Sequence, residues 1–332
     1  MRHYFSAMAA VILFTSCGKP EQISIKKVKE HLQTEGINYR QELRTFIQDI
    51  SAWARTQQPN FIVVAQNSSE LLTTGGSATD SVVSAYVKAL NGIGREELLY
   101  GYDNNDDMAT PADVKNEWLS LCKLAKTNGL QVMATDYCTT PAKITDSYQT
   151  NNKYGFISFA ATKRQLSNVP AGAPYNENTN NINTLADAKN FLYYINAGDD
   201  TKFLASLKAT NYDVLVIDAF SQDNRLPWSK AVINSLKVKK NGAKRLVLAY
   251  MSIGQAEQYR WYWHSDWKSN PPEWLEQLDP YWEGNFYVRY WMPEWKKLIY
   301  GNADAYTQKI LDAGFDGTYL DPVDGSGYWE EK

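Results

Sequence analysis

Short apolar runs rich in β-branched residues recur along the chain and alternate with stretches whose apolar residues follow a helical period. Continuous runs of this kind are typical of strands buried on both faces of a parallel sheet. We predict eight strands, at residues 61–65, 90–100, 130–136, 191–196, 212–220, 245–253, 286–291 and 317–321.

Helical periodicity is clearest in three stretches between these runs. Residues 38–56 place Leu43, Phe46 and Ile50 on one face, and residues 114–125 end before an Asn-Gly pair. The third stretch runs from Trp295 to Ile310. Strands that alternate with helices eight times predict an α/β fold, the (β/α)8 TIM barrel. A doubly wound open sheet is the alternative, and the absence of G-x-G-x-x-G and Walker-type loops after the strands disfavours it.

The first residues have the pattern of an export signal. Arg2 and His3 precede an apolar run at 7–14, which stops at Thr15-Ser16-Cys17. This run is far shorter than the ~20 residues that a membrane-spanning helix needs. We expect residues 1–16 to be a lipoprotein signal peptide and Cys17 to be lipidated, which would anchor an exported protein to a bacterial membrane, in the cell envelope or at the surface. A plain signal peptide with an incidental cysteine is the alternative.

The remaining chain divides at one irregular stretch. We expect a tether at 17–35, then a barrel over 36–332. A Pro/Gly/Asn-rich linker at 167–183 separates its halves, 36–166 and 184–332. Cys122 and Cys138 are the two cysteines within the barrel, too few for a disulfide framework, and they can pair once or remain two buried thiols.

Composition narrows the class of partner. The formal net charge of -3 argues against a nucleic-acid partner. The chain contains 11 Trp and 22 Tyr, and seven of the Trp lie between Trp261 and Trp295. Aromatic rings stack on the C–H faces of sugars, although we expect about half of them to pack in the core. We therefore expect a monomer that binds a polysaccharide.

The carboxyl ends of the strands indicate where chemistry could occur, because the site of a (β/α)8 barrel lies at that end. Several carboxylates there suit glycoside hydrolysis, and they would equally suit a divalent cation such as Ca²⁺. Of the two histidines beyond the signal peptide, His31 and His264, neither follows a strand, which disfavours a Ser-His-Asp triad or a zinc site. We expect no metal and no cofactor. The polar and aromatic residues at strand ends are Gln66, Asn67, Asp136, Tyr137, Asn196, Asp218, Tyr250, Ser252, Glu257, Arg289, Trp291, Asp321 and Asp324.

Four motifs resemble those of glycoside hydrolase family 114, which includes endo-α-1,4-polygalactosaminidases and has the (β/α)8 barrel fold. They are 212–218 (YDVLVID), 248–263 (LAYMSIGQAEQYRWYW), 284–295 (GNFYVRYWMPEW) and 314–321 (GFDGTYLD). The resemblance extends to 59–72 and, more loosely, to 90–100 and 156–164.

The resemblance implies an exported hydrolase that cleaves an amino-sugar polysaccharide with Asp218 and Glu257 as the catalytic pair. Asp321 would be a third carboxylate that binds substrate or tunes the pair, and Tyr250 or Trp291 could stack on a sugar ring. The other candidates for substrate binding are Gln66, Asn67, Asp136 and Arg289. A carbohydrate-binding barrel without activity and a structural or assembly lipoprotein are the alternatives.

Two features depart from the family pattern. Gln255 stands where many relatives carry Glu. The order of segments also differs: in the family, the segment that resembles 59–72 comes after the one that resembles 314–321, whereas here it comes first. The sequence therefore predicts a circularly permuted barrel, in which strand 61–66 lies parallel to strand 317–321 with helix 38–56 packed over the junction. A truncated barrel behind an unrelated N-terminal domain is the alternative.

Overall fold

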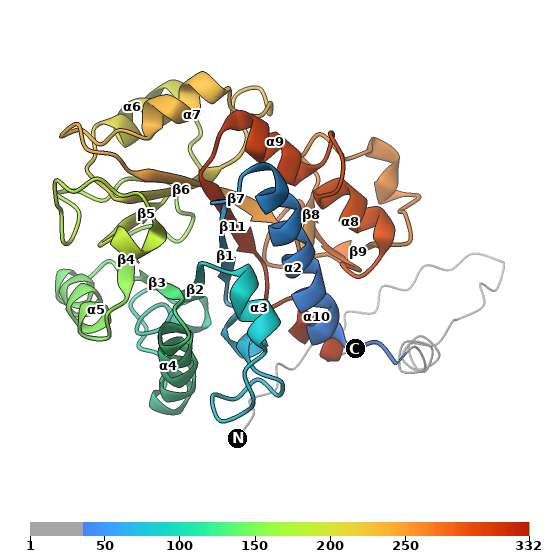
Figure 1. Ribbon diagram of the computed structural model, residues 1–332, viewed down its shortest axis with the longest axis horizontal. Coiled ribbons are helices and arrows are strands. Elements are labelled where there is room, and N and C mark those ends of the chain that lie inside the picture. The colour runs from blue at the N-terminus through green and yellow to red at the C-terminus, as the bar shows by residue number, and fades with distance from the viewer. Residues whose placement is uncertain (1–35, 332) are drawn as a thin grey trace, which may run out of the picture. The chain divides into compact units, whose positions relative to one another are not determined.

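Eight parallel strands form a sheet that curves into a nearly closed barrel in the computed structural model, which describes residues 36–331 (Figure 1). Their order in the sheet is β4-β3-β2-β1-β11-β7-β6-β5. Most strand residues are buried on both faces, which explains the continuous apolar runs. The (β/α)8 fold is thus confirmed. The strands are β1 (Ile62–Gln66), β2 (Gly92–Glu96), β3 (Gln131–Tyr137), β4 (Ile157–Ala161), β5 (Phe191–Tyr193), β6 (Val214–Asp218), β7 (Leu246–Ser252) and β11 (Gly317–Asp321).

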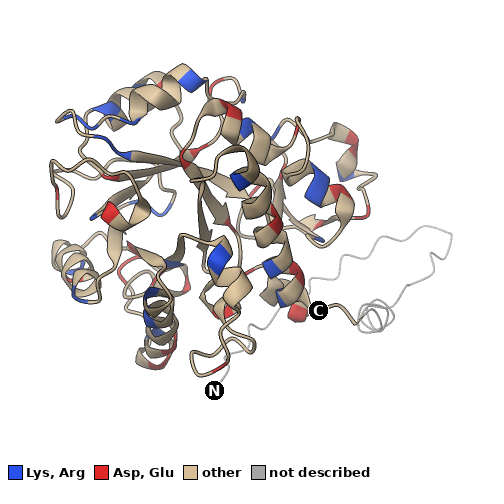
Figure 2. Cartoon of the chain, viewed as in Figure 1, with Lys and Arg blue, Asp and Glu red and all other residues tan. Residues whose placement is uncertain are grey.

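Helices surround the strands, and their outward faces mix acidic and basic residues in the view of Figure 2. The predicted helices 38–56 and 114–125 are confirmed as α2 and α4. The stretch from Trp295 to Ile310 is two helices instead of one, because Gly301 adopts a left-handed conformation (φ 93°) between them. The helices are α2 (Tyr39–Gln57), α3 (Ser84–Ala89), α4 (Ala112–Thr127), α5 (Pro141–Lys153), α6 (Asp200–Lys208), α7 (Lys230–Leu236), α8 (Pro293–Ile299), α9 (Tyr306–Ala313) and α10 (Ser326–Glu330), with short 3-10 turns at Ser69–Leu72, Tyr102–Asn104, Leu185–Asp187 and Ser265–Lys268.

A second, antiparallel sheet of three strands lies between β7 and α8 in the chain. It consists of β8 (Gln255–Glu257), β10 (Asn285–Val288) and β9 (Leu275–Leu278), with β10 in the middle. The predicted barrel strand 286–291 was therefore wrong, since its first part is β10 of the antiparallel sheet. The missing barrel strand is β4, whose five residues, ISFAA, include small and polar ones that weaken the apolar pattern.

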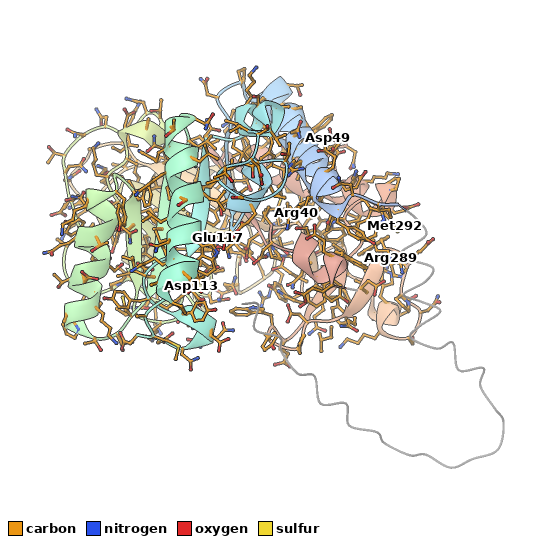
Figure 3. All side chains as sticks on the ribbon, turned by 90° about the horizontal axis from the view of Figure 1, so that it is seen from below. Arg40, Asp49, Asp113, Glu117, Arg289 and Met292 are labelled. Carbon is orange, nitrogen blue, oxygen red and sulfur yellow. The ribbon has the colours of Figure 1, made fainter. Side chains whose placement is uncertain are left out.

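The N-terminal and C-terminal parts of the chain meet in the middle of the barrel sheet. Strand β1 pairs in parallel with β11, and Ile62 lies opposite Gly317. Helix α2 covers this junction, where Arg40 pairs with Glu330 of α10 (Nε–Oε1 2.8 Å) and Asp49 accepts a hydrogen bond from Tyr300 at 2.8 Å. Figure 3 labels Arg40 and Asp49 on α2. The predicted neighbourhood of strands 61–66 and 317–321 is confirmed, whereas the permutation relative to other family members stays a prediction.

The linker at 167–183 has no regular secondary structure but is anchored to the barrel. Asn178 donates a hydrogen bond to Asp213, and Lys239 reaches the same carboxylate at 2.5 Å in a completely buried ion pair. Cys122 and Cys138 are both free and buried, so the two do not form a disulfide. The predicted signal peptide, Cys17 and the tether at 17–35 lie outside the described residues, and within 36–331 no helix is long and apolar enough to span a bilayer.

The closing strand pair depends on a glycine. A Cβ atom on Gly317 would collide with the carbonyl oxygen and the side chain of Ile62, the residue that lies opposite Gly317 in the β1–β11 pairing. We predict that Gly317→Ala destabilises the protein by about 1–3 kcal/mol, as overpacking of a rigid core does. Urea denaturation measures this loss, and Gly327→Ala, at a site with no atom within 4 Å of the new Cβ, is the matched control. Equal stability of the two variants would contradict the proposed strain.

Candidate active site

A cavity of about 550 Å³ opens at the carboxyl ends of the barrel strands. Its polar lining comes from strands that are far apart in sequence, because parallel strands of a barrel all end at the same rim. The strand-end residues on it are Asn67, Glu96, Tyr137, Asp218, Tyr250 and Asp321. Strand β8 adds Gln255 and Glu257, and the segment after β11 adds Asp324.

Asp218 and Glu257 meet on one buried guanidinium. Arg260 donates to both oxygens of Asp218, at 2.8 and 2.9 Å, and its Nε lies 2.5 Å from Oε2 of Glu257. Arg260 is 5% exposed and Glu257 is 1% exposed, so water screens these ion pairs little. One positive charge is thus shared by two carboxylates, which leaves a net negative charge when both are ionised.

Further hydrogen bonds fix the two carboxylates in place. Tyr259 donates its hydroxyl to Glu257 at 2.6 Å, and the Tyr262 hydroxyl accepts from the Glu257 backbone N–H at 2.9 Å. Asp218 accepts from the Phe220 backbone N–H at 2.8 Å. The string SIGQAEQYRWYW therefore supplies a carboxylate, its counter-ion and two tyrosines from consecutive turns of chain.

A second group of carboxylates lies on the same cavity without such a counter-ion. Tyr250 donates its hydroxyl to Asp321 at 3.1 Å, and none of the ion pairs found within residues 36–331 involves Asp321 or Asp324. Burial, with Glu96 and Asp324 nearby, holds the pKa of Asp321 well above its usual range, and burial raises the pKa of Asp324 to about 6. Asp321 therefore retains a proton at pH values where an ordinary aspartate is ionised.

Gln255 has a role that glutamate could not take. Its amide nitrogen donates to Asp279 at 2.6 Å, and its amide oxygen accepts from Asn285 at 3.1 Å. A glutamate at this buried position would place a second carboxylate against Asp279, with no donor between them. The departure from the family pattern is thus compensated by the local hydrogen-bond network and leaves Glu257 unaffected.

Five of the predicted site residues lie on the cavity: Asn67, Asp218, Tyr250, Glu257 and Asp321. Four others do not, and the structure corrects their predicted placement. They are Gln66, Asp136, Arg289 and Trp291.

Two of these four are buried structural residues, Asp136 between strand β3 and helix α5 and Gln66 inside the barrel. The Asp136 carboxylate is completely buried and accepts hydrogen bonds from Leu99, Tyr100, Ser147 and Asn151. Gln66 points into the barrel, where its side-chain oxygen accepts a hydrogen bond from Tyr319. Side chains of a strand alternate in direction, so a residue at the end of a strand need not face the mouth.

The other two belong to the antiparallel sheet and its surroundings. Arg289, labelled in Figure 3, forms an ion pair with Glu276 of β9 at 2.8 Å. Trp291 packs against Tyr39 of α2, with ring centroids 5.0 Å apart, and against Trp329 of α10. Both residues follow β10, and because β10 is not a barrel strand, its end does not lead to the barrel mouth.

Sequence reasoning missed several lining residues. Glu96 ends β2, but the predicted strand ran to residue 100, so its end was sought in the wrong place. Glu96 accepts hydrogen bonds from Asn67, at 3.1 Å, and from Tyr137. Sequence reasoning also missed Arg260 as the counter-ion. This residue lies in the motif 248–263, and its position three residues after Glu257 is the signal that could have identified it. Within residues 36–331 no group of three or more His, Cys, Asp or Glu side chains is arranged to hold a metal ion.

The fold and the cavity define a (β/α)8-barrel protein whose mouth is lined with carboxylates and aromatic residues. Residues 172–331 match the model of glycoside-hydrolase family GH114. Residues 172–331, which include Asp218, Glu257 and Asp321, are thus similar to that family, and the match bears out the resemblance found in the motifs.

Curated relatives are similar to part of the chain. An uncharacterized protein of Methanocaldococcus jannaschii is 37% identical over 183 residues, which are 53% of this chain and 50% of the relative. Uncharacterized proteins of Thermotoga maritima and Deinococcus radiodurans are 35% and 36% identical over 143 and 121 residues, covering 43% and 36% of this chain and 41% and 36% of theirs. The chain thus spans half or less of the length of these relatives.

The raised pKa of Asp321 predicts a pH dependence of stability. A carboxyl whose pKa is higher in the folded than in the unfolded state stabilises the fold below the unfolded value, about 3.9, and loses this contribution as the pH rises. We predict that Asp321→Asn gives a higher urea midpoint than the parent at about pH 8 and an equal one at about pH 4. Asp304→Asn, at an exposed site, is the control, and a variant that gains nothing at the higher pH would contradict the prediction.

Proposed function

We propose that the protein is a glycoside hydrolase that cleaves an amino-sugar polysaccharide with Asp218 and Glu257. The observation that carries this proposal is the convergence of the two carboxylates, from β6 and β8, on one side of an open cavity. Family GH114 membership of residues 172–331 supports the reaction class.

The chemistry requires one carboxyl to protonate the glycosidic oxygen as the bond to the anomeric carbon breaks. The other carboxylate attacks that carbon directly or activates a water molecule that does so. Arg260 holds both groups in position before substrate binds, and preorganisation of this kind lowers the cost of orienting the reacting groups. Asp321 would bind a substrate hydroxyl or amine, or alter the proton affinity of the pair.

The charge of the lining favours a cationic sugar. Seven acidic residues line the cavity, against two arginines, Arg164 and Arg225: Glu96, Asp218, Glu257, Asp279, Glu283, Asp321 and Asp324. A cleft with one sign of charge attracts substrate units of the opposite sign. A polymer with free amino groups, such as de-N-acetylated galactosamine, fits this requirement better than a neutral polysaccharide.

A carbohydrate-binding barrel without activity is the second candidate. It is favoured by the same ion pairs, because a guanidinium that occupies both carboxylates also suits a purely structural network. Turnover on an amino-sugar polymer distinguishes the two candidates, since a binding protein would retain the polymer without shortening it.

Amide substitutions test the catalytic pair. Asp218→Asn and Glu257→Gln keep the side-chain shape and remove the proton chemistry, so we predict that turnover of a de-N-acetylated galactosamine polymer falls at least ~10²-fold in each. Reducing-end release measures turnover, and circular dichroism verifies folding. Asp304→Asn is the matched control outside the cavity. Near-full activity in both amide variants would refute the assignment.

We also propose that the protein is exported and held at a bacterial membrane by a lipid on Cys17. A basic start, a short apolar run and small residues before the cysteine support this proposal. One acyl chain binds a membrane only weakly, so a multiply acylated N-terminus is expected.

The anchor makes a separate prediction. Cys17→Ala should abolish incorporation of a labelled fatty acid and move the protein from the detergent phase to the aqueous phase in Triton X-114 partitioning. Cys122→Ala is the control, because that thiol is buried in the barrel. If the Cys17 variant keeps its label and its partitioning, the anchor is elsewhere.

A further inference from the structure

One tryptophan on the cavity wall is left open to solvent. Trp282 is 51% exposed, and it is the one tryptophan among the residues lining the cavity described above. Trp274 and Trp295, from the same Trp-rich region, are buried in the core. A single exposed apolar side chain is normal on a protein surface, so its place on the same cavity as Asp218 and Glu257 is what distinguishes Trp282.

The loop that carries Trp282 is held in place by hydrogen bonds. It spans residues 279–284 between β9 and β10. Asp279 accepts from the Tyr281 backbone N–H at 2.8 Å and from Gln255 at 2.6 Å, so the loop is tied to β8. At its other end the Gly284 carbonyl accepts from the Gln258 backbone N–H at 2.8 Å. A side chain on a loop fixed in this way loses little freedom when it binds a ligand.

Strand pairing sets the distance from Trp282 to the catalytic pair. Asn285 lies opposite Glu257 in the β8–β10 ladder, and Trp282 is three residues before Asn285. Three residues of chain span at most about 10 Å, a distance that a few sugar units bridge. Tyr287, two residues after Asn285, also lines the cavity and stacks on Tyr328 with ring centroids 3.8 Å apart. The cavity is therefore lined by other aromatic residues of the same region besides Trp282.

We propose that Trp282 is the stacking platform of an outer subsite, which binds a sugar ring of the polysaccharide several units from the bond that is cleaved. The proposal rests on the hydrolase function proposed above and extends it to chain-length preference. The indole face would contact the C–H face of the ring, while Asp279 and Glu283, which also line the cavity, provide acceptors for its hydroxyl or ammonium groups. Only a chain long enough to reach from the carboxylates to Trp282 gains this contact.

The test compares short and long substrates. De-N-acetylated galactosamine oligosaccharides are separated into a short fraction, whose chains do not reach from Asp218 and Glu257 to Trp282, and a long fraction, whose chains do. The kcat and KM are measured for each fraction. For Trp282→Ala we expect KM for long chains to rise about tenfold, equivalent to about 1.4 kcal/mol, and KM for short chains and kcat to stay unchanged. Tyr281→Ala is the matched control, because Tyr281 is the neighbouring aromatic residue, is 72% exposed and does not line the cavity.

The outcomes separate this proposal from the proposed function. Cleavage by the parent with unchanged KM in Trp282→Ala, or equal losses in Trp282→Ala and Tyr281→Ala, overturns the platform and leaves the hydrolase function standing. If the parent binds long chains by calorimetry in a Trp282-dependent way but cleaves none, the platform stands and the hydrolase function fails. If the parent neither binds nor cleaves these chains, both are overturned.

Discussion

The parallel pairing of β1 with β11 is the constraint on which the rest of this protein depends. It joins the two ends of the chain in the middle of the barrel sheet, so neither half can complete a closed barrel alone. Helix α2 precedes β1 in the chain and packs over the β1–β11 junction, where it also contacts α9 and α10 (Figure 1). Gly317 allows this pairing, since a side chain there would collide with the backbone of Ile62.

Closure of the barrel also determines the electrostatics of the cavity. Asp218 and Glu257 share the single charge of Arg260, whereas neither Asp321 nor Asp324 forms an ion pair within residues 36–331. Two groups of carboxylates therefore face one space in different surroundings: one is paired with a cation, and the other has no cation of its own. Desolvation raises the pKa of both members of the second group.

The small antiparallel sheet serves both the carboxylates and the substrate path. Strand β8 carries Glu257, and the β9–β10 loop carries Trp282, so one hydrogen-bonded unit positions the proposed chemistry and the proposed outer subsite together. Gln255 connects them through Asp279.

The sequence by itself determined the features that depend on local patterns. Buried apolar runs predicted seven of the eight barrel strands. The motifs indicated the family that residues 172–331 match, and they contain Asp218, Glu257 and Asp321, which line the cavity. These inferences succeed because a run of consecutive apolar residues indicates both a strand that is buried on both faces and the residue at which that strand ends.

Only the tertiary structure decided which strand ends face the cavity and what surrounds each carboxylate. Asp136 and Glu96 both lie near the carboxyl ends of barrel strands, yet one is buried among four donors and the other lines the cavity. The shared guanidinium of Arg260 and the exposed face of Trp282 likewise depend on contacts across the fold. Side-chain direction, desolvation and ion pairing arise between residues that are distant in the chain, so no pattern of neighbouring residues encodes them.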